Sequence, residues 1–484
     1  MTHSFVKKAA RGVGWKILGQ GVQQAIRFVI IIILTKLLNP GDFGTFAMVL
    51  VFTEFILPLR EWGFQAALIQ KENIDQEYQS TAFWAICCVA VILYLLSLIF
   101  APFVGWFFNS SLVAQIIPVI AIIFLLSPFG SIQWAVLSRS LDFKTIVLIN
   151  MAATLGYGIA ACALAFKGFG VWSLVWATIF REFLSSLMLW FSRGWRPLLK
   201  FNLGKLRELW SFSISCMGSG ILDYGVNYFD NLAVGKFLGA VPLGFYNLAF
   251  NTVSQPQTRI VSQIASVIFP IYSMIKDDPK RIREAYLKTV KMVAVITVPI
   301  VSILFMTAHD FVLVFYGPKW LPAVLPIRIM CFYGLIRALT SIAGPVFLSK
   351  GRPDIDFKLS IFNLCIFIMC LFFGIRHGIV GVSIAVLLSA LVNFFPTFYL
   401  SDRLLDIDHW KLGAIIFKYV VLSAIIIGAL WMVNFFLQWE AIASPFPRLV
   451  GKCAIGLCAY LALWIVYLKP DFDALVTLVK KAIL

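Results

Sequence analysis

Charged residues are scarce in this chain. Only 13% of its 484 residues are Asp, Glu, Lys or Arg, whereas 61% are hydrophobic. Soluble globular domains carry about 25% charged residues, so the composition excludes an ordinary soluble protein. The apolar residues gather in runs of about 20 residues, the length that a helix needs to cross a hydrocarbon core of about 30 Å. The sequence therefore predicts an all-α, polytopic membrane protein.

Residues that commonly bind metals or catalyse reactions are also few. The four histidines are scattered along the chain. The nine cysteines lie within or beside apolar runs, and spacings such as Cys365 to Cys370 match no metal or redox motif. The sequence contains no glycine-rich loop of the Walker type, and its loops are too short for a catalytic or nucleotide-binding domain. We expect a protein that has no cofactor and is not an enzyme.

The apolar runs form two sets of six and a final pair. The first set lies at residues 14–38, 43–69, 81–108, 112–137, 145–166 and 169–191. The second set lies at 210–237, 243–272, 287–309, 320–348, 358–375 and 378–400, and the pair lies at 412–436 and 448–468. The sequence thus predicts about fourteen transmembrane helices.

The net charge of +17 is distributed unevenly across the predicted membrane. When the spans are threaded alternately, most cations fall on the side that holds the N-terminus. The opposite loops carry little beyond Lys36, Lys167, Lys236, Lys319, Arg376, Arg448 and Lys452. Because cytoplasmic loops are enriched in Lys and Arg, we expect both termini in the cytoplasm. The same placement assigns the positive charge to membrane topology, and we expect no nucleic-acid partner.

The chain contains an internal repeat. Lys36, Leu38 and Gly44 in "KLLNPGDFGTF" match Lys236, Leu238 and Gly244 in "KFLGAVPLGFY", at an offset of 200 residues. Farther along, "LSRSLDFK" (137–144) is similar to "LSKGRPDIDFK" (348–358), with a larger offset that insertions explain. A repeat of this length in an apolar chain indicates two related bundles of helices.

The repeat divides the chain into four parts. Residues 1–192 form an N-terminal six-helix lobe, 193–209 a basic cytoplasmic linker, 210–401 a C-terminal six-helix lobe, and 402–484 two additional transmembrane helices with a cytoplasmic tail. Because each lobe has an even number of helices, a pseudo-twofold axis along the membrane normal relates them. Two such bundles leave a cavity between them, on which alternating access depends. Transport is therefore the expected function.

Several segments resemble one family of membrane transporters. They are "LTKLLNPGDFGTFAMVLVFTEFILPLREWGFQAALIQKENI" (34–74), "LSRSLDFKT" (137–145), "GFGVWSLV" (168–175), "FYNLAFN" (245–251) and "VIFPIYSMIKDD" (267–278). The chain is similar here to bacterial polysaccharide exporters, the lipid-linked oligosaccharide flippases of the multidrug/oligosaccharidyl-lipid/polysaccharide superfamily. Among these it most resembles the colanic-acid and lipopolysaccharide exporter branch.

This resemblance implies a substrate and a site. The substrate would be an undecaprenyl-pyrophosphate-linked oligosaccharide or polysaccharide repeat unit, moved across the bacterial inner membrane to the periplasmic leaflet. In related lipid-II flippases, arginines on the first, second and eighth helices contribute to a cationic cavity. The corresponding helices here carry Arg27, Arg60 and Arg259. Membrane lipids and the polysaccharide assembly machinery are the further partners that we expect.

Polar residues share one face of the first predicted span. Gln20 and Gln23 precede Arg27 by seven and four residues, which places all three on one helical face. With the 200-residue offset, Gln23 corresponds to Asp223 and Arg27 to Asn227. Charges in the middle of spans are functional candidates by default. From this polar face and from what the resemblance implies for Arg60 and the other arginines, we predict that the substrate binds Arg27, Arg60, Arg259, Gln23 and Asn227.

The residues leave alternatives open for several of these positions. Instead of binding the substrate, Arg27 could form an ion pair with Glu54 or another acid inside the N-terminal lobe. Arg60 could instead extend its side chain to the lipid headgroups. Asp223 and Asp230 are seven residues apart and share a face. Together with Glu54, they either bind a coupling proton or sodium ion or act as counter-ions to the arginines.

Two other functions remain as alternatives to the flippase. A multidrug exporter of the same superfamily would share the repeat, but acidic and aromatic cavity residues would suit its cationic substrates. A membrane-embedded glycan polymerase or ligase would need a catalytic constellation on a large external loop. The arginine-bearing spans favour the flippase over the first alternative, and the short loops favour it over the second.

Overall fold

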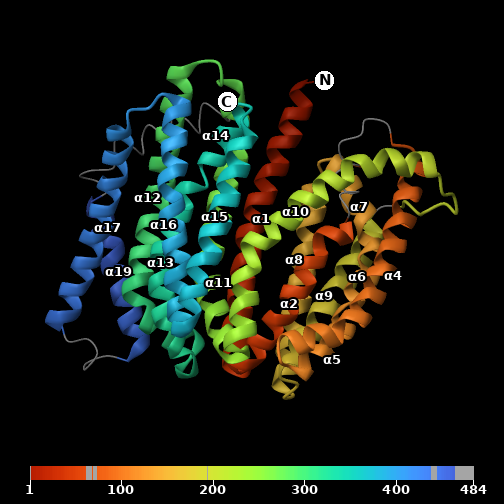
Figure 1. Cartoon of the computed structure of the whole chain (residues 1–484), viewed down its shortest axis with the longest axis horizontal. Coiled ribbons are helices and arrows are strands. Elements are labelled where there is room, and N and C mark those ends of the chain that lie inside the picture. The colour runs from red at the N-terminus through yellow and green to blue at the C-terminus, as the bar shows by residue number, and fades with distance from the viewer. Residues whose placement is uncertain (1, 62–67, 69–73, 193, 438–443, 464–484) are drawn as a thin grey trace. The chain divides into compact units, whose positions relative to one another are not determined.

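The computed structural model of the chain describes residues 2–61, 68, 74–192, 194–437 and 444–463 (Figure 1). Every regular element in these ranges is helical, and none of the described residues forms a strand. The predicted all-α fold class is therefore confirmed.

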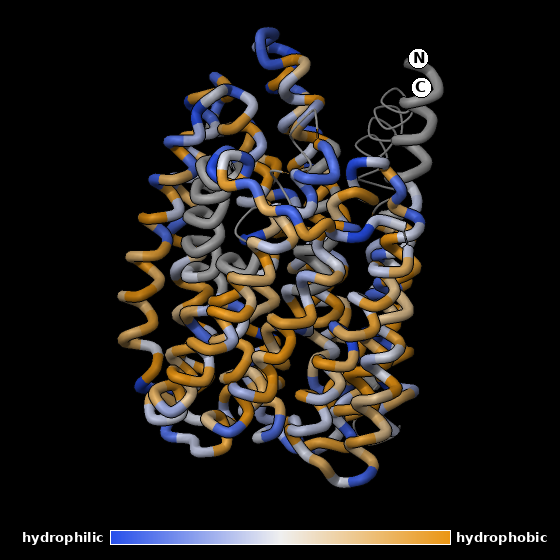
Figure 2. The backbone as a smooth tube through the Cα atoms, turned by 90° about the vertical axis from the view of Figure 1, so that its right-hand side faces the viewer, coloured by the Kyte–Doolittle hydropathy of each residue, from blue (hydrophilic) through white to orange (hydrophobic). Residues whose placement is uncertain are grey.

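The described helices are those of a multi-pass membrane protein. In the described part of the chain, nine segments are long and apolar enough to cross a membrane, and a bent pair of helices raises the number to ten. One segment, Pro353–Leu405, contains both α15 (Pro353–Gly374) and α16 (Gly378–Leu405). Figure 2 shows hydrophobic residues along the middle of the helices and hydrophilic stretches mostly at their ends. The total of fourteen spans stays a prediction.

The chain forms two compact units, which divide at Gly244 and Phe245. Most helices of the first unit are long, and a few are short. They are α1 (Thr2–Leu37), α2 (Pro40–Glu61), α4 (Gln76–Phe107), α5 (Ser111–Ile120), α6 (Ile122–Leu126), α7 (Pro128–Arg139), α8 (Phe143–Phe166), α9 (Val171–Ser192) and α10 (Leu203–Leu238). Helix α10, the first helix of the predicted C-terminal lobe, packs against α2 and α4 within this unit. The predicted domain boundaries stay predictions.

The second unit is organised around α12 (Pro279–Phe311). It also contains most of α11 (Ala240–Met274), then η1 (Val312–Tyr316), η2 (Pro318–Ala323), α13 (Val324–Thr340), α14 (Ala343–Ser349), α15, η3 (Ile375–His377), α16, α17 (His409–Leu437) and α19 (Pro445–Leu463). Helix α12 packs against α13, α16, α17 and α19. Its face of small branched residues, with Val290, Val293 and Val298 almost fully buried, forms the centre of the apolar core.

The predicted span at 112–137 is broken in the structure. It consists of α5, α6 and α7, and the axis bends by 44° between Ser111–Leu126 and Pro128–Arg139. Pro128 has no backbone N–H, so it cannot donate the helical hydrogen bond to the carbonyl group four residues earlier, and its ring crowds that carbonyl group. The proline therefore begins a new helix.

Small residues set the distance between α1 and α8. A side chain added at Gly19 would overlap Val147, and one added at Gly158 would overlap Ile30. Glycines at such positions let membrane helices approach closely, and close packing is a main source of attraction between helices in lipid. The two contacts also fix the register of α1 along α8.

The two glycines matched by the repeat lie against each other's helices. A Cβ atom on Gly44 would overlap the carbonyl oxygen of Ala240, and one on Gly244 would overlap the carbonyl oxygen of Pro40. The two contacts are reciprocal under the offset of 200 residues, because 40 and 44 correspond to 240 and 244. Only glycine leaves room for backbones this close. The reciprocal contact is what the predicted pseudo-twofold repeat requires of these positions.

We expect Gly44→Ala to destabilise the protein by about 1–3 kcal/mol, because the new methyl group forces two backbones apart. Thermal unfolding of the purified protein measures this loss. Gly41→Ala on the same helix is the control, since its Cβ would make only an ordinary contact, 3.4 Å from Val241. Equal unfolding temperatures for the two variants would contradict the close crossing.

Candidate functional site

The polar face of α1 lies against α8. The side-chain amide of Gln23 donates a hydrogen bond of 2.8 Å to the Thr154 hydroxyl oxygen and one of 3.4 Å to the Asn150 carbonyl oxygen. Thr154 in turn donates to the Asn150 carbonyl at 2.7 Å. Gln23 is therefore held by a buried hydroxyl group in the first unit. Its predicted contact with the substrate stays a prediction.

Arg27 follows one turn after Gln23 and is half-buried. Ten residues of α1 separate it from Leu37, where the helix ends, and this distance is about 15 Å of helix. A guanidinium group at this depth is far from both membrane surfaces and needs water or a polar partner. Arg27 has polar or electrostatic partners within the protein, and its role in substrate binding stays a prediction.

Four other predicted residues have side chains outside the described part of the structure. Arg60 lies on α2, Asp223 and Asn227 on α10, and Arg259 on α11. Their roles stay predictions.

The remaining two acidic candidates meet at one tyrosine. The Tyr228 hydroxyl group on α10 is hydrogen-bonded to the Glu54 carboxylate on α2, and Asp230 lies within electrostatic reach of the same phenol. Asp230 is only 4% exposed and accepts a hydrogen bond of 2.8 Å from the Asn231 backbone N–H. The described residues include no group of three or more His, Cys, Asp or Glu side chains that could hold a metal ion. Two carboxylates near one phenol can hold a proton or a monovalent cation, or can balance positive charge.

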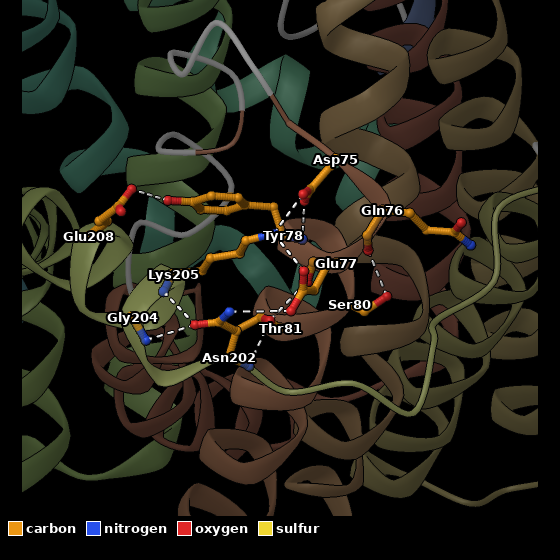
Figure 3. Close-up of polar contacts among 10 residues, drawn as sticks. All are labelled: Asp75, Gln76, Glu77, Tyr78, Ser80, Thr81, Asn202, Gly204, Lys205 and Glu208. Atoms are coloured by element: carbon orange, nitrogen blue, oxygen red, sulfur yellow. Dashed lines mark hydrogen bonds and ion pairs between the residues drawn. The ribbon is translucent and has the colours of Figure 1, made fainter.

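The linker before α10 is fastened to the start of α4 by a polar network (Figure 3). We call Asp75, Glu77, Asn202 and Lys205 the linker clamp. The Lys205 ammonium group lies 2.6 Å from the Asp75 carboxylate and 2.8 Å from the Glu77 carboxylate. The Asn202 side-chain amide donates to Glu77 at 3.2 Å. The hydroxyl group of Tyr78, which follows Glu77 in the chain, donates a hydrogen bond to the Glu208 carboxylate on α10.

Backbone groups of the linker also bind α4. The N–H groups of Leu198 and Asn202 donate to the hydroxyl oxygens of Ser80 and Thr81, at 2.9 and 3.2 Å. The Trp84 indole N–H donates to the Leu198 carbonyl oxygen at 2.9 Å. Residues 198–205 therefore follow the first turns of α4, to which they are held by both backbone and side-chain hydrogen bonds.

The linker clamp is strongest at neutral pH. Hydrogen bonds from Lys205 lower the pKa of the Asp75 and Glu77 carboxyl groups, and the two carboxylates raise the pKa of Lys205. A carboxyl group whose pKa is lowered by folding contributes its whole stabilisation when the pH is above the ordinary pKa of the group, about 4. This contribution is lost as the pH falls through the lowered values.

A buried charge triad joins α19 to α12 within the second unit. The Asp310 carboxylate on α12 lies 2.9 Å from Arg448 and 2.8 Å from Lys452, both on α19. The exposed fractions of the three side chains are 3%, 8% and 7%. The expectation that Arg448 and Lys452 lie in an outer loop is therefore wrong, because both are buried within α19. Farther along the same two helices, the Tyr460 hydroxyl group donates a hydrogen bond to the Val295 carbonyl oxygen at 2.7 Å.

Sequence reasoning missed the triad and the clamp for different reasons. Lys452 and Asp310 are 142 positions apart, and no local pattern links them. The clamp had a local signal, because Asp75 and Asn202 are helix N-caps whose side chains accept backbone hydrogen bonds. The caps indicate where α4 and α10 begin, but they do not indicate that the two helix ends meet.

Comparisons with known proteins give the family and the fold. A family model described as "Polysaccharide biosynthesis protein" matches residues 33–325. The chain is 24% identical to the lipopolysaccharide biosynthesis protein WzxC of Escherichia coli (strain K12), over 82% of this chain and 81% of that protein. It is 26% identical to the succinoglycan biosynthesis transport protein ExoT of Rhizobium meliloti (strain 1021), over 65% and 64%. The structure is similar to that of the lipid II flippase MurJ in an inward closed conformation, with a TM-score of 0.77, 13% identity, and coverage of 93% and 98%.

We expect the double variant Asp75→Asn, Glu77→Gln to loosen the linker. Asn keeps the N-cap of α4, while Lys205 loses both carboxylate partners. Chymotrypsin should then cut after Phe201, which is 49% exposed, several times faster than in the wild type. Asp278→Asn, at the capped start of α12, is the control. Unchanged cleavage at Phe201 would show that the clamp does not hold the linker.

We expect Asp310→Asn to lower the free energy of unfolding by about 3–5 kcal/mol, because two buried cations lose their carboxylate. Asp406→Asn removes a carboxylate that pairs with Arg283 but is 96% exposed, so its loss should stay below about 1 kcal/mol. Chemical or thermal unfolding in detergent measures both. A similar effect of the two substitutions would argue against a structural role for the triad.

Proposed function

Because the chain belongs to the family of polysaccharide biosynthesis proteins, we propose that it is a flippase that moves undecaprenyl-pyrophosphate-linked glycans across the bacterial inner membrane. The match to the family model over residues 33–325 carries this proposal. Two bacterial relatives are named for polysaccharide biosynthesis, and one of them is named a transport protein. The fold is that of a lipid II flippase. The chain acts as a transporter and not as an enzyme.

The proposed substrate explains a positive charge deep in the membrane. A glycan on a diphosphate cannot cross hydrocarbon without replacing much of its hydration, and guanidinium groups form paired, charge-assisted hydrogen bonds with phosphate oxygens. Arg27 lies at the middle of the apolar span Leu18–Leu37, which is the second half of α1. We place Arg27 at the diphosphate, with Arg60, Arg259, Gln23 and Asn227 as the further substrate-binding residues.

Alternating access between two parallel repeats is the proposed mechanism. The reciprocal contacts of Gly44 and Gly244 support the repeat on which it rests. Glu54 and Asp230, which share Tyr228, are the proposed site of a coupling proton or sodium ion, together with Asp223. The competing assignment of these acids is as counter-ions to the arginines.

The orientation follows from the charge distribution. The excess of Lys and Arg on the side of the N-terminus supports cytoplasmic termini. The linker clamp would then face the cytoplasm, where a lipid-linked repeat unit is delivered. The membrane proteins of the polysaccharide assembly machinery are the proposed partners at the opposite surface.

We expect Arg27→Ala to reduce glycan transport at least about tenfold, because one charge-assisted contact with the diphosphate is lost. The assay uses proteoliposomes with an undecaprenyl-diphosphate-linked oligosaccharide, and it measures protein-dependent arrival of the sugar in the opposite leaflet, with and without ion gradients. Lys36→Ala, a cation in the last turn of the same helix, is the matched control and should transport normally. If the wild type moves no glycan under any gradient, the proposed function is wrong.

A further inference from the structure

A second arginine lies at the same depth as Arg27. Arg181 lies ten positions after Val171, where α9 begins, and Arg27 lies ten positions before Leu37, where α1 ends. At 1.5 Å per residue, each guanidinium-bearing residue is about 15 Å of helix from that end. The end of α1 and the beginning of α9 lie at the same level along the helix axes, because Leu38 and Leu174 belong to one apolar cluster, together with Ala165 at the end of α8. Arg27 and Arg181 therefore lie near the middle of the membrane.

The contacts between α1 and α8 place Arg27 beside Tyr157. Gln23 is hydrogen-bonded to Thr154, and farther along in the same direction, seven residues later on α1 and four later on α8, Ile30 lies against Gly158. Arg27 falls between these two contacts on α1, as Tyr157 does on α8. The register of the two helices thus brings the arginine and the tyrosine to the same level.

The contacts between α8 and α9 bring Arg181 to this level from the other side. A Cβ atom on Gly156 would lie 2.8 Å from Leu184 and 3.2 Å from Phe180, so this part of α8 lies against the turn that contains Arg181. Both guanidinium groups act electrostatically on the Tyr157 phenol. Three helices therefore contribute two cations and one hydroxyl group to one place in the first unit.

Arg181 differs from Arg27 in its surroundings. Its side chain is exposed, and it forms no hydrogen bond or ion pair with any residue that the structure describes. Glu182 is its neighbour in the chain, but adjacent residues on a helix do not face each other. The arginine is also too deep to reach the headgroups, and a guanidinium group in contact with hydrocarbon is strongly unfavourable. Arg181 must therefore meet water or an anion.

We propose that Arg181, together with Arg27 and Tyr157, binds the diphosphate group of the transported lipid. This inference rests on the proposed function and names a part of its substrate site. A diphosphate has two phosphate groups, and each arginine can bind one of them through paired N–H groups. The Tyr157 hydroxyl group, on which both arginines act electrostatically, donates a hydrogen bond to an oxygen of the diphosphate. The two arginines together balance most of the charge of the diphosphate.

Binding of a defined lipid tests the proposal. The purified full-length protein in detergent is titrated with undecaprenyl diphosphate and, separately, with undecaprenyl monophosphate. We expect Arg181→Gln to weaken diphosphate binding about tenfold and monophosphate binding much less, because one phosphate group still has Arg27. Arg181→Lys should recover part of the affinity. Lys167→Gln, a change of an exposed cation at the end of α8, is the control and should bind both lipids like the wild type.

A labelling experiment tests the surroundings of Arg181 independently of affinity. In proteoliposomes, Arg181→Cys should react with a membrane-impermeant thiol reagent, as read at this position by mass spectrometry, and undecaprenyl diphosphate should slow the reaction. No reaction at position 181 would mean that the side chain faces lipid, and this would overturn the proposal.

The outcomes separate the two hypotheses. If the wild type binds and transports the lipid-linked glycan but Arg181→Gln binds undecaprenyl diphosphate equally well, the inference on Arg181 is wrong and the flippase function stands. If the wild type neither binds the diphosphate lipid nor moves the glycan, the proposed function is wrong and the inference fails with it. The unfolding temperature of each variant shows that a loss of binding is not a loss of folding.

Discussion

A charged side chain inside a membrane must have water or a polar partner, and this constraint accounts for the most informative features of the chain. Asp310 meets it by pairing with Arg448 and Lys452, and all three side chains are buried. Arg181 meets it differently, because it is exposed at mid-depth and forms no ion pair within the described residues. The first arrangement joins two helices. The second leaves a cation available to a ligand.

Ion pairs between lysine and carboxylates stabilise the fold less where the side chains are exposed to water. The linker clamp also pairs a lysine with carboxylates, but Asp75 is 60% exposed, and exposed pairs contribute little individually. What orders the linker is the combination of the ion pairs with backbone hydrogen bonds to Ser80 and Thr81. The clamp fixes where α10 begins, and α10 then packs along α2, where Tyr228 meets Glu54. A surface network thus positions a polar contact inside the membrane.

The sequence predicted those features that depend on composition or periodicity. Apolar runs gave the all-α membrane fold, and the repeat matched Gly44 with Gly244, which the structure places in reciprocal contact. A helical face shared by Gln23 and Arg27 was also predictable, but the neighbour that this face contacts was not, because it depends on how α1 packs against α8. The charge triad escaped prediction since its members are far apart in sequence. Arg181 was not predicted to bind the substrate, because the sequence does not show that its side chain is exposed and unpaired among the described residues.

The location of the arginines within one unit bears on how a transporter of this kind could work. Arg27, Tyr157 and Arg181 lie on α1, α8 and α9. Gly19, Gly158 and the hydrogen bond of Gln23 to Thr154 fix α1 against α8, and the contact of Gly156 with Phe180 and Leu184 fixes α9 against α8. These contacts are all internal to the first unit, so a rigid-body movement of that unit leaves them intact. A diphosphate bound there would keep its counter-charges throughout alternating access. The two arginines would then offset the cost of moving the diphosphate from water into the membrane when the substrate binds, and no further cost of this kind would arise at the later conformational steps.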